Sequence, residues 1–456
     1  MPLPPQLRSL AGHFDRGVTY TLLNRFANMA CSLLVISLVL TVFSSEVQGY
    51  YFTFNSLLLG QVLLELGFGI VLIQFISHEW ASLGYDDRGD ITGAQHAVAR
   101  LGSLVRFSLK WYGALALIFL VAVGSFGQWF LRAASSERVA VFLPWWLLCV
   151  GVGANLVIFP LRCFLEGSNQ VHRSQACTLW ANIAGNIAGC PVIVLGGGLF
   201  ALAAISLVTA AVNALLLTKA CLPFFRLMRA SGAANGVSWR EEFLPQQRRI
   251  GVSWSAGYVM YQSAIPIVFR NIGPKAAGKL GATLQIYNGI NIIASSFLNA
   301  AGPRMGILGA KREYAKLQQL VRRTWLQCLF LSAVLGLGAV AAIAGLKHWG
   351  FPQGERFAEW PVTLIYIGVV IAQQLMNAET TAVRFQKLDP FVGNSVLCAA
   401  LVLLGNVFLG QRFGLIGVAV GFAIVTVVVA MPWCHYVYNG TIACFLKKGC
   451  ENAASG

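Results

Sequence analysis

The chain has 456 residues, of which 57% are hydrophobic and only 11% are charged. Soluble globular proteins carry roughly 25% charged residues, so this composition, with a mean hydropathy of +0.68, indicates a membrane protein. The formal net charge of +16 could suit a nucleic acid. No basic block stands apart from the apolar segments, however, so membrane topology and anionic lipid explain the charge better, and we expect no nucleic-acid partner.

Apolar segments long enough to cross a bilayer recur along the whole chain. A spanning helix needs about 20 apolar residues. We expect twelve spans, near residues 18–43, 50–76, 108–131, 139–162, 175–196, 198–220, 250–270, 282–303, 323–346, 358–381, 391–410 and 413–437. Three consecutive glycines, 196–198, separate the fifth span from the sixth and predict a tight hairpin there.

The distribution of lysine and arginine predicts the orientation of these spans. With the N-terminus in the cytoplasm, 25 of the 33 basic residues fall on the inner segments and their flanks, and the remaining 8 fall outside. Cytoplasmic loops carry the excess of positive charge in membrane proteins. We therefore expect a multi-pass membrane protein with both termini in the cytoplasm.

A long basic linker divides the twelve spans into six and six. This division predicts an N-lobe over residues 1–225, a cytoplasmic linker over 226–249, a C-lobe over 250–446 and a cytoplasmic tail over 447–456. An even number of spans gives both halves the same orientation, which is the condition for a parallel repeat. The expected fold class is an all-α integral membrane protein with two six-helix lobes around a central cavity.

Glu65 is the only charged residue between Tyr50 and Ile76. On a continuous helix it shares an arc of about 120° with Asn55, Gln61 and Gly69, and it lies near mid-membrane. A charge at that depth costs about 2.5–3.5 kcal/mol on insertion scales. Either a neutral acid hydrogen-bonded between helices or a cavity residue that binds a cation or proton fits this position.

Further polar residues interrupt other spans. Arginines lie at or near the ends of spans, and Arg162 and Glu166 are four residues apart, which permits a local ion pair. Amides inside spans often join helices, but their number suggests a hydrated central space. The candidates are Asn24, Arg25 and Asn28 in the first span, Arg162 in the fourth, Asn182 and Asn186 in the fifth, Arg270 in the seventh, Asn288 and Asn291 in the eighth, and Glu379 in the tenth.

The sequence contains no motif that indicates catalysis or a bound cofactor. His78 and Glu79 are not followed by the second histidine of an HExxH zinc motif, and neither a phosphate-binding loop nor a dinucleotide fingerprint is present. The 11 cysteines are scattered mostly inside apolar segments without a CxxC pair, so we interpret them as reduced packing residues. We expect no enzyme activity, metal or cofactor.

The run EVQGYYFTFNSLLLGQVLLELGFG, with QFISHEWA after it, resembles the bacterial polysaccharide and O-antigen flippases (Wzx-like) of the MOP superfamily, which also holds the lipid II flippase and the multidrug and toxin extrusion (MATE) transporters. The hairpin pattern Glu-x-x-Gly-x-Tyr is typical of these proteins and reads here Glu46, Gly49 and Tyr51. The run QIYNGINIIASSFLNAAGPRMG, with Pro303 at its inner end, adds to the resemblance.

The resemblance implies two bundles around a cavity that opens alternately to either side, and a polyprenyl-diphosphate-linked oligosaccharide as substrate, as in lipopolysaccharide synthesis. Membrane lipids, a polysaccharide polymerase and glycosyltransferases would be its partners, and an H⁺ or Na⁺ gradient would drive it. The expected cationic substrate site comprises Arg25, Arg162, Arg270 and Arg304, the coupling acids are Glu65 and Glu379, and the polar lining comprises Asn24, Asn28, Gln61, Asn288 and Asn291.

Three alternatives stay open at this point. A multidrug antiporter of the same fold would favour an acidic cavity, whereas most charges at the membrane edges here are basic. A non-transporting scaffold of a polysaccharide synthesis complex would not need an ionisable group at mid-membrane. An ion channel would favour oligomeric symmetry around a pore over two lobes in one chain.

Overall fold

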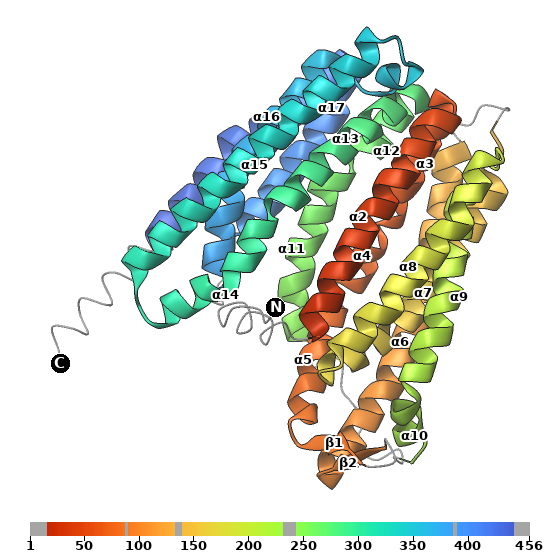
Figure 1. Cartoon of the computed structure of the whole chain (residues 1–456), viewed down its shortest axis with the longest axis vertical. Helices are drawn as coiled ribbons and strands as arrows, with labels where there is room; N and C mark the ends of the chain where they lie inside the picture. Colours follow the sequence, from red (N-terminus) through yellow and green to blue (C-terminus); the bar gives the residue numbers. More distant parts are fainter. Residues whose placement is uncertain (1–15, 87–89, 133–138, 231–242, 386–389, 442–456) are drawn as a thin grey trace, which may run out of the picture. The chain divides into compact units, whose positions relative to one another are not determined.

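The structure is a computed structural model, and it describes residues 16–86, 90–132, 139–230, 243–385 and 390–441. The chain is almost entirely helical over these ranges (Figure 1). It forms two compact units. Unit 1 comprises Met1–Val47 and Leu57–Trp254, and unit 2 comprises Gln48–Ser56 and Ser255–Gly456.

Unit 1 consists of long helices and one small hairpin of strands. Helices α7, α8 and α9 pack against one another, and α2 lies along α8. The two strands pair antiparallel with Leu83 opposite Gly93. The elements are α2 (Arg16–Val42), the two ends of α3 (Ser45–Leu58), α4 (Gln61–Glu65), α5 (Phe68–Trp80), β1 (Leu83–Tyr85), β2 (Ile91–Gly93), α6 (Gln95–Arg132), α7 (Phe142–Gly167), α8 (Val171–Val194), α9 (Phe200–Ala220), α10 (Leu222–Ala230) and the first half of α11 (Leu244–Gln262).

Unit 2 is a second helical bundle, in which α15 and α16 pack together and α12 packs on α13 and α17. Its elements are the middle of α3 (Gln48–Ser56), the second half of α11, α12 (Ala264–Asn271), α13 (Pro274–Ala294), α14 (Ser296–Ala310), α15 (Tyr314–His348), the 3-10 turn η2 (Pro352–Arg356), α16 (Trp360–Arg384), α17 (Val392–Ile424) and the π-helical segment η3 (Val425–Ala430), followed by a helix over 431–441.

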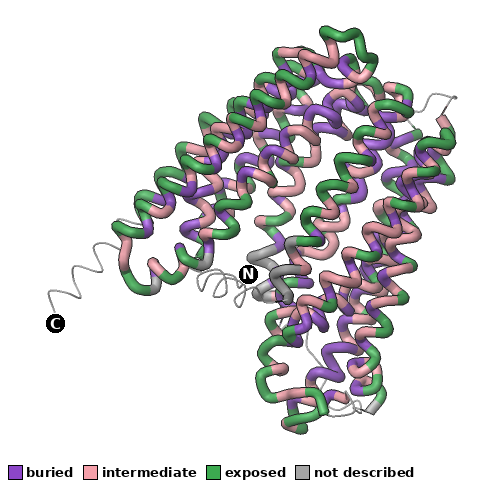
Figure 2. Tube along the Cα trace, in the orientation of Figure 1, coloured by how far each residue is buried: buried purple, intermediate pink, exposed green. Residues whose placement is uncertain are grey.

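Buried and exposed positions alternate along the helices of each unit (Figure 2). Many of the exposed positions hold large apolar side chains. Leu195, Tyr436 and Phe330 are among the most exposed of these, at 85%, 79% and 71%. Water would oppose such exposure, whereas lipid would not. This surface therefore belongs to a multi-pass membrane protein.

Among the described residues, eight helices are long and apolar enough to cross a membrane, or nine if the bent pair formed by Ser45–Glu65 and Phe68–Trp80 is one span. Two features separate this count from the twelve expected spans. Val392–Thr441 counts once although Gly414, with φ 63° and ψ −143°, interrupts it between the last two expected spans. The expected spans 250–270 and 282–303 fall on the broken pairs α11–α12 and α13–α14.

The glycine hairpin between the fifth and sixth expected spans is confirmed. Helix α8 ends at Val194 and α9 begins at Phe200. Gly196 and Gly198 have φ of 79° and 55°, and a residue without a Cβ adopts this left-handed region at little cost.

The division into units differs in detail from lobes that follow each other along the chain. The segment Gln48–Ser56 of α3 belongs to unit 2, where Tyr50 is fully buried with its ring 4.9 Å from that of Phe269. Gly49 lies so close to the Pro274 carbonyl that a Cβ there would be 1.9 Å from the oxygen. The tyrosine-rich hairpin pattern thus serves close packing in unit 2. The lobe boundaries at 225 and 250 stay a proposal, and residues 231–242 of the linker and the tail 447–456 lie outside the described residues.

Candidate functional site: a polar cavity in unit 1

The span that carries Glu65 is broken immediately after it. Leu66 and Gly67 have φ of 50° and 70°, and the two parts of the span meet at 46°. A positive φ is rare for a residue with a bulky side chain, so the surrounding structure must hold Leu66 in place. Leu66 packs against Gly251 of α11, where a Cβ would lie 2.9 Å from that of Leu66.

The break leaves backbone groups of the span without their helical partners, which is costly in lipid. Helix α11 supplies one replacement, because the buried Gln247 donates a hydrogen bond from Nε2 to the carbonyl of Glu65 at 3.1 Å. The sequence does not single out Gln247. Its contribution depends on how α11 packs on the break, which no local pattern in the sequence predicts.

The Glu65 carboxylate is fixed by two donors. The hydroxyl of Tyr112, on α6, donates to Oε1 at 2.9 Å, and the backbone amide of Gly69 donates to the same oxygen at 3.3 Å. Tyr112 is itself fully buried, with its ring 5.8 Å from that of Phe68 and 5.5 Å from that of Phe159. Glu65 is therefore a rigidly held acceptor at the break.

Glu65 lines a cavity of about 410 Å³ that lies wholly within unit 1. Five of the predicted site residues line this cavity together: Asn24, Asn28, Gln61, Glu65 and Arg162. The other lining residues are Asn155, Leu156, Ile158, Phe159, Thr178, Asn182, Thr209, Asn213 and Leu217. Among the residues that the structure describes, the lining is rich in amides and holds a single acidic and a single basic side chain.

A chain of amides runs along the α2 side of the cavity. Asn24 donates to Gln175 at 2.9 Å, Asn28 donates to Asn24 at 3.1 Å, and Asn182 donates to Asn28 at 2.9 Å. Glu166 accepts from Ser174 at 2.8 Å and from Gln175 at 3.3 Å. The sequence permitted an ion pair between Glu166 and Arg162, but Glu166 instead anchors the end of this amide chain.

A second pair of amides lies on α7 and α9. Asn213 donates to Asn155 at 3.3 Å, and Asn155 donates to the Gly151 carbonyl at 3.0 Å. The buried Oδ1 of Asn213 has no hydrogen-bond partner within the described part of the chain. A buried acceptor without a partner is costly. Since Asn213 lines the cavity, a ligand hydroxyl or amide could supply the missing donor.

Arg162 is the one cation of the cavity lining. Its guanidinium carbon lies 5.8 Å from the centre of the Phe159 ring, and it attracts the Glu65 carboxylate electrostatically. Its Nε is buried and finds no hydrogen-bond partner among the residues that the structure describes. A free donor next to a carboxylate could take a ligand oxygen.

The remaining predicted site residues do not line this cavity. Arg25 lies on α2 but is exposed. In unit 2, Arg270 of α12 and Arg304 of α14 are exposed. Asn288 lines a small void with Tyr261 and Tyr287, and Asn291 accepts hydrogen bonds from Gln374 at 3.3 Å and Asn377 at 3.1 Å.

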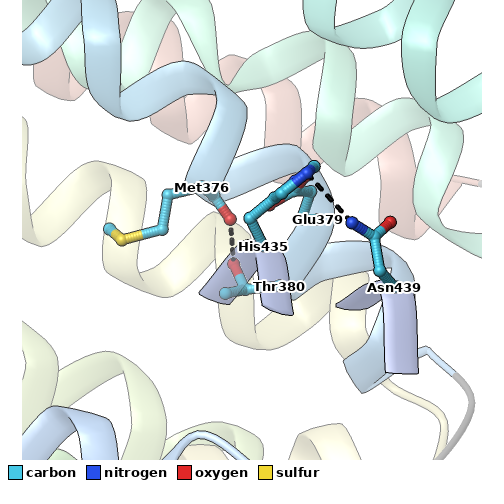
Figure 3. Close-up of polar contacts among 5 residues, drawn as sticks. All are labelled: Met376, Glu379, Thr380, His435 and Asn439. Carbon is cyan, nitrogen blue, oxygen red and sulfur yellow. Dashed lines mark hydrogen bonds and ion pairs between the residues drawn. The ribbon is translucent and has the colours of Figure 1, made fainter. Parts of the chain in front are cut away.

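Glu379 belongs to a separate polar cluster in unit 2 (Figure 3). Its Oε1 lies 2.6 Å from Nδ1 of His435, and the Asn439 amide lies 2.9 Å from Nε2 of the same ring. The Glu379 side chain is 4% exposed and the His435 side chain 56%. The second carboxylate oxygen, Oε2, has no partner among the described residues, so it is an acceptor that could take a proton. Nothing in the sequence singles out His435 as the partner of Glu379.

Comparison with solved structures gives the fold class. A multidrug resistance MATE family transporter of the MOP superfamily, in an inward-facing conformation, superposes with a TM-score of 0.65 at 14% identity, over 91% of this chain and 95% of that one. Lipid II flippase MurJ, in an inward closed conformation, gives a TM-score of 0.67 at 11% identity, over 92% and 87%. A MOP superfamily transporter from Pyrococcus furiosus, described by the reverse polarity of its binding pocket, gives 0.52 at 13% identity, over 94% of each chain.

The chain therefore has the all-α fold of the membrane transporters of the MOP superfamily. Its sequence matches no protein-family model and no curated protein. The fold that the resemblance implies is confirmed, and the structural neighbours include both a multidrug resistance transporter and a lipid II flippase.

Proposed function

We propose that the protein is a flippase that moves a polyprenyl-diphosphate-linked oligosaccharide from the cytoplasmic to the outer face of a bacterial inner membrane. The observation that carries this proposal is the cavity of unit 1, whose described lining holds six amide side chains, one carboxylate and one guanidinium. Amide groups donate and accept hydrogen bonds at once, which suits the hydroxyls of a sugar. The proposed substrate class is therefore the lipid-linked O-antigen unit of lipopolysaccharide, whose sugars carry many hydroxyls.

The cationic contribution is assigned to Arg162, which could receive the diphosphate or an acidic sugar through its free Nε. Arg25, Arg270 and Arg304 stay proposed contacts of the substrate along its path. Asn288 and Asn291 stay proposed polar contacts in unit 2. Both termini are proposed to lie in the cytoplasm, where polymerase and glycosyltransferase partners would meet the protein.

Coupling to an H⁺ or Na⁺ gradient is proposed for two acids. Glu65 is half-buried in the cavity with Tyr112 as its donor, and Glu379 is buried against His435. Binding of a cation would neutralise the carboxylate and change which conformation of the transporter is favoured. The Glu65→Gln variant removes the charge at nearly constant shape, so it is expected to export slowly and to lose its dependence on the gradient.

The test is made in a strain that lacks this protein. A non-permeant glycan-binding probe is applied to intact spheroplasts and to opened vesicles. The proposal predicts that the lipid-linked saccharide is reached only in opened vesicles and returns to the outer face when the wild-type chain is restored. Normal labelling of intact spheroplasts without the protein would contradict it.

A multidrug antiporter is the second candidate. It is favoured by the carboxylate of Glu65 in a cavity with an aromatic wall at Phe159, since both groups attract organic cations. An antiporter would change the susceptibility of the strain to cationic drugs and leave the saccharide unaffected. A non-transporting scaffold would be unaffected by Glu65→Gln in both assays.

A further inference from the structure

Helix α15 presents one face outward from unit 2 along much of its length. Residues spaced three or four apart on this face are exposed, beginning with Gln319, Arg322 and Arg323 and continuing with Leu326 and Phe330. The opposite face is buried and holds Leu317, Val321, Thr324 and Cys328. The outer face thus changes from polar and basic to apolar within about two helical turns.

This change coincides with the edge of a membrane-crossing stretch. No charged residue lies between Arg323 and Lys347, and these 24 steps correspond to about 36 Å of helix at 1.5 Å per residue. The hydrocarbon core of a bilayer is about 30 Å thick. The two arginines therefore lie at the level of the lipid headgroups, and Leu326 and Phe330 lie at the level of the first acyl carbons.

An open groove of about 550 Å³ joins these two levels. Its lining is Gln319, Arg322, Arg323, Leu326, Gln327 and Phe330. Leu326 is 46% exposed and Phe330 71%. The groove therefore offers hydrogen-bond donors and positive charge at one end and apolar surface at the other.

Both guanidinium groups are available to a ligand. Within the described residues, neither Arg322 nor Arg323 makes an ion pair or a hydrogen bond through its side chain. Earlier on the same helix, Lys316 does have a partner, because its Nζ lies 2.7 Å from the Glu313 carboxylate. The hydrogen bond and charge of Lys316 lower the pKa of Glu313, so that pair is ionised and neutral as a unit.

We propose that this groove binds one anionic phospholipid of the leaflet at which α15 begins, which the charge distribution predicts to be the cytoplasmic one. Arg322 and Arg323 would hold the phosphate, since two planar guanidinium groups match phosphate oxygens. Gln319 and Gln327 would bind the glycerol headgroup, and an acyl chain would lie along Leu326 and Phe330. Basic pockets beside spanning helices recognise anionic headgroups in this way.

The test is native mass spectrometry of the purified full-length protein, titrated with phosphatidylglycerol or phosphatidylcholine. The proposal predicts a preference for phosphatidylglycerol. In the R322Q/R323Q variant its affinity should fall about 30-fold at low salt, because each basic residue near an anionic lipid contributes roughly fivefold. The control K311Q/R312Q removes the same charge from the same side of unit 2, outside the groove, and should keep wild-type affinity.

Three outcomes would overturn the proposal. Equal binding of the two lipids would remove the specific role of the headgroup, and equal losses in the two variants would reduce the effect to general surface charge. A dimer of the protein that dissociates in a Leu326→Gln/Phe330→Gln variant would show that a second copy covers the groove. Thermal unfolding of each variant in detergent shows whether it is folded, and no step of this test depends on transport.

Discussion

The Tyr112 hydroxyl donates a hydrogen bond to Glu65 across two helices, at 2.9 Å from a fully buried ring. The carboxylate lies at the point where its span breaks, and a donor from a different span fixes it there. The contact ties the position of α6 to the state of the acid. Any step that protonates Glu65 or pairs it with a cation must act on this bond.

The Tyr112→Phe variant tests this relationship. A hydrogen bond to a charged group contributes about 1.5–3 kcal/mol, so we expect its loss to leave Glu65 poorly placed and to slow saccharide export about tenfold. Export is measured as outer-face labelling per unit of protein. Tyr366→Phe is the matched control, because Tyr366 is also buried but its hydroxyl makes no hydrogen bond with the described residues. Equal losses in both variants would contradict a specific role for the Tyr112 contact.

Gly69 provides a test of packing beside the acid. A Cβ at residue 69 would lie 2.5 Å from the Phe159 ring and 2.9 Å from Oε1 of Glu65. Overpacking of this kind costs about 1–3 kcal/mol, so Gly69→Ala should lower the thermal unfolding temperature in detergent and also reduce export.

Gly113 of α6 is the control for this substitution, because a Cβ there meets no atom within 4 Å. Helix propensity favours alanine over glycine by up to about 1 kcal/mol, and Gly113→Ala should therefore be neutral or slightly stabilising. A Gly69→Ala protein as stable and active as Gly113→Ala would show that the wall of the cavity yields easily.

Asn213 tests whether the amides act on a ligand or only join helices. The Asn213→Leu variant keeps the volume, loses one long hydrogen bond and removes the unpartnered acceptor of the cavity. We expect export to fall about tenfold while the unfolding temperature changes little. Asn186→Leu is the control, since within the described residues Asn186 donates only to the Asn182 carbonyl and does not line the cavity. If both variants lose stability together and export in proportion, the amides are helix contacts alone.

The pair formed by Glu379 and His435 is suited to a double-mutant cycle. Removing one partner of a buried pair leaves the other unsatisfied, so Glu379→Gln and His435→Gln should each destabilise the protein. The free energy of unfolding of each variant is measured by denaturation in detergent. In the double variant this free energy should fall by about 0.5–3 kcal/mol less than the sum of the two single decreases. Because His435 is more than half exposed, we expect a value in the lower part of this range. Additive losses would mean that the two side chains do not interact.

The sequence predicts features that depend on local residue types, such as the ends of helices. It does not predict features that depend on contacts between helices far apart in the chain. The hairpin at Gly196–Gly198 follows from the local freedom of glycine. Helical periodicity also places Gln61 and Glu65 together, since both lie on the short helix α4 before the break. The same periodicity fails for Asn55, which donates to the Tyr51 carbonyl and belongs to unit 2. The span also breaks at Leu66, immediately after Glu65, and the sequence does not predict this break, because leucine rarely adopts a positive φ.

The remaining cavity residues could not be selected from the sequence. The sequence shows Asn182 only as an amide within a span. Its hydrogen bond to Asn28 joins two residues that are 154 positions apart in the chain, so no local pattern predicts it. Tyr112 and Asn213 are unremarkable polar residues in apolar segments until α6 and α9 bring them to the cavity. The sequence does not show which residues come into contact in the fold. It therefore cannot distinguish Arg162, which lines the cavity, from the three other predicted arginines, which do not.

The side of the membrane on which the lipid-linked saccharide is found decides whether the protein is a flippase. It is measured with the non-permeant probe in the deletion strain carrying the wild-type chain, Glu65→Gln or the Gly113→Ala control. We expect full outer-face labelling with the wild-type and control chains, and a reduced outer-face signal with Glu65→Gln, because slow export leaves more saccharide on the cytoplasmic face. Outer-face labelling in the strain without any chain, or an undiminished signal with Glu65→Gln, would contradict the proposed function.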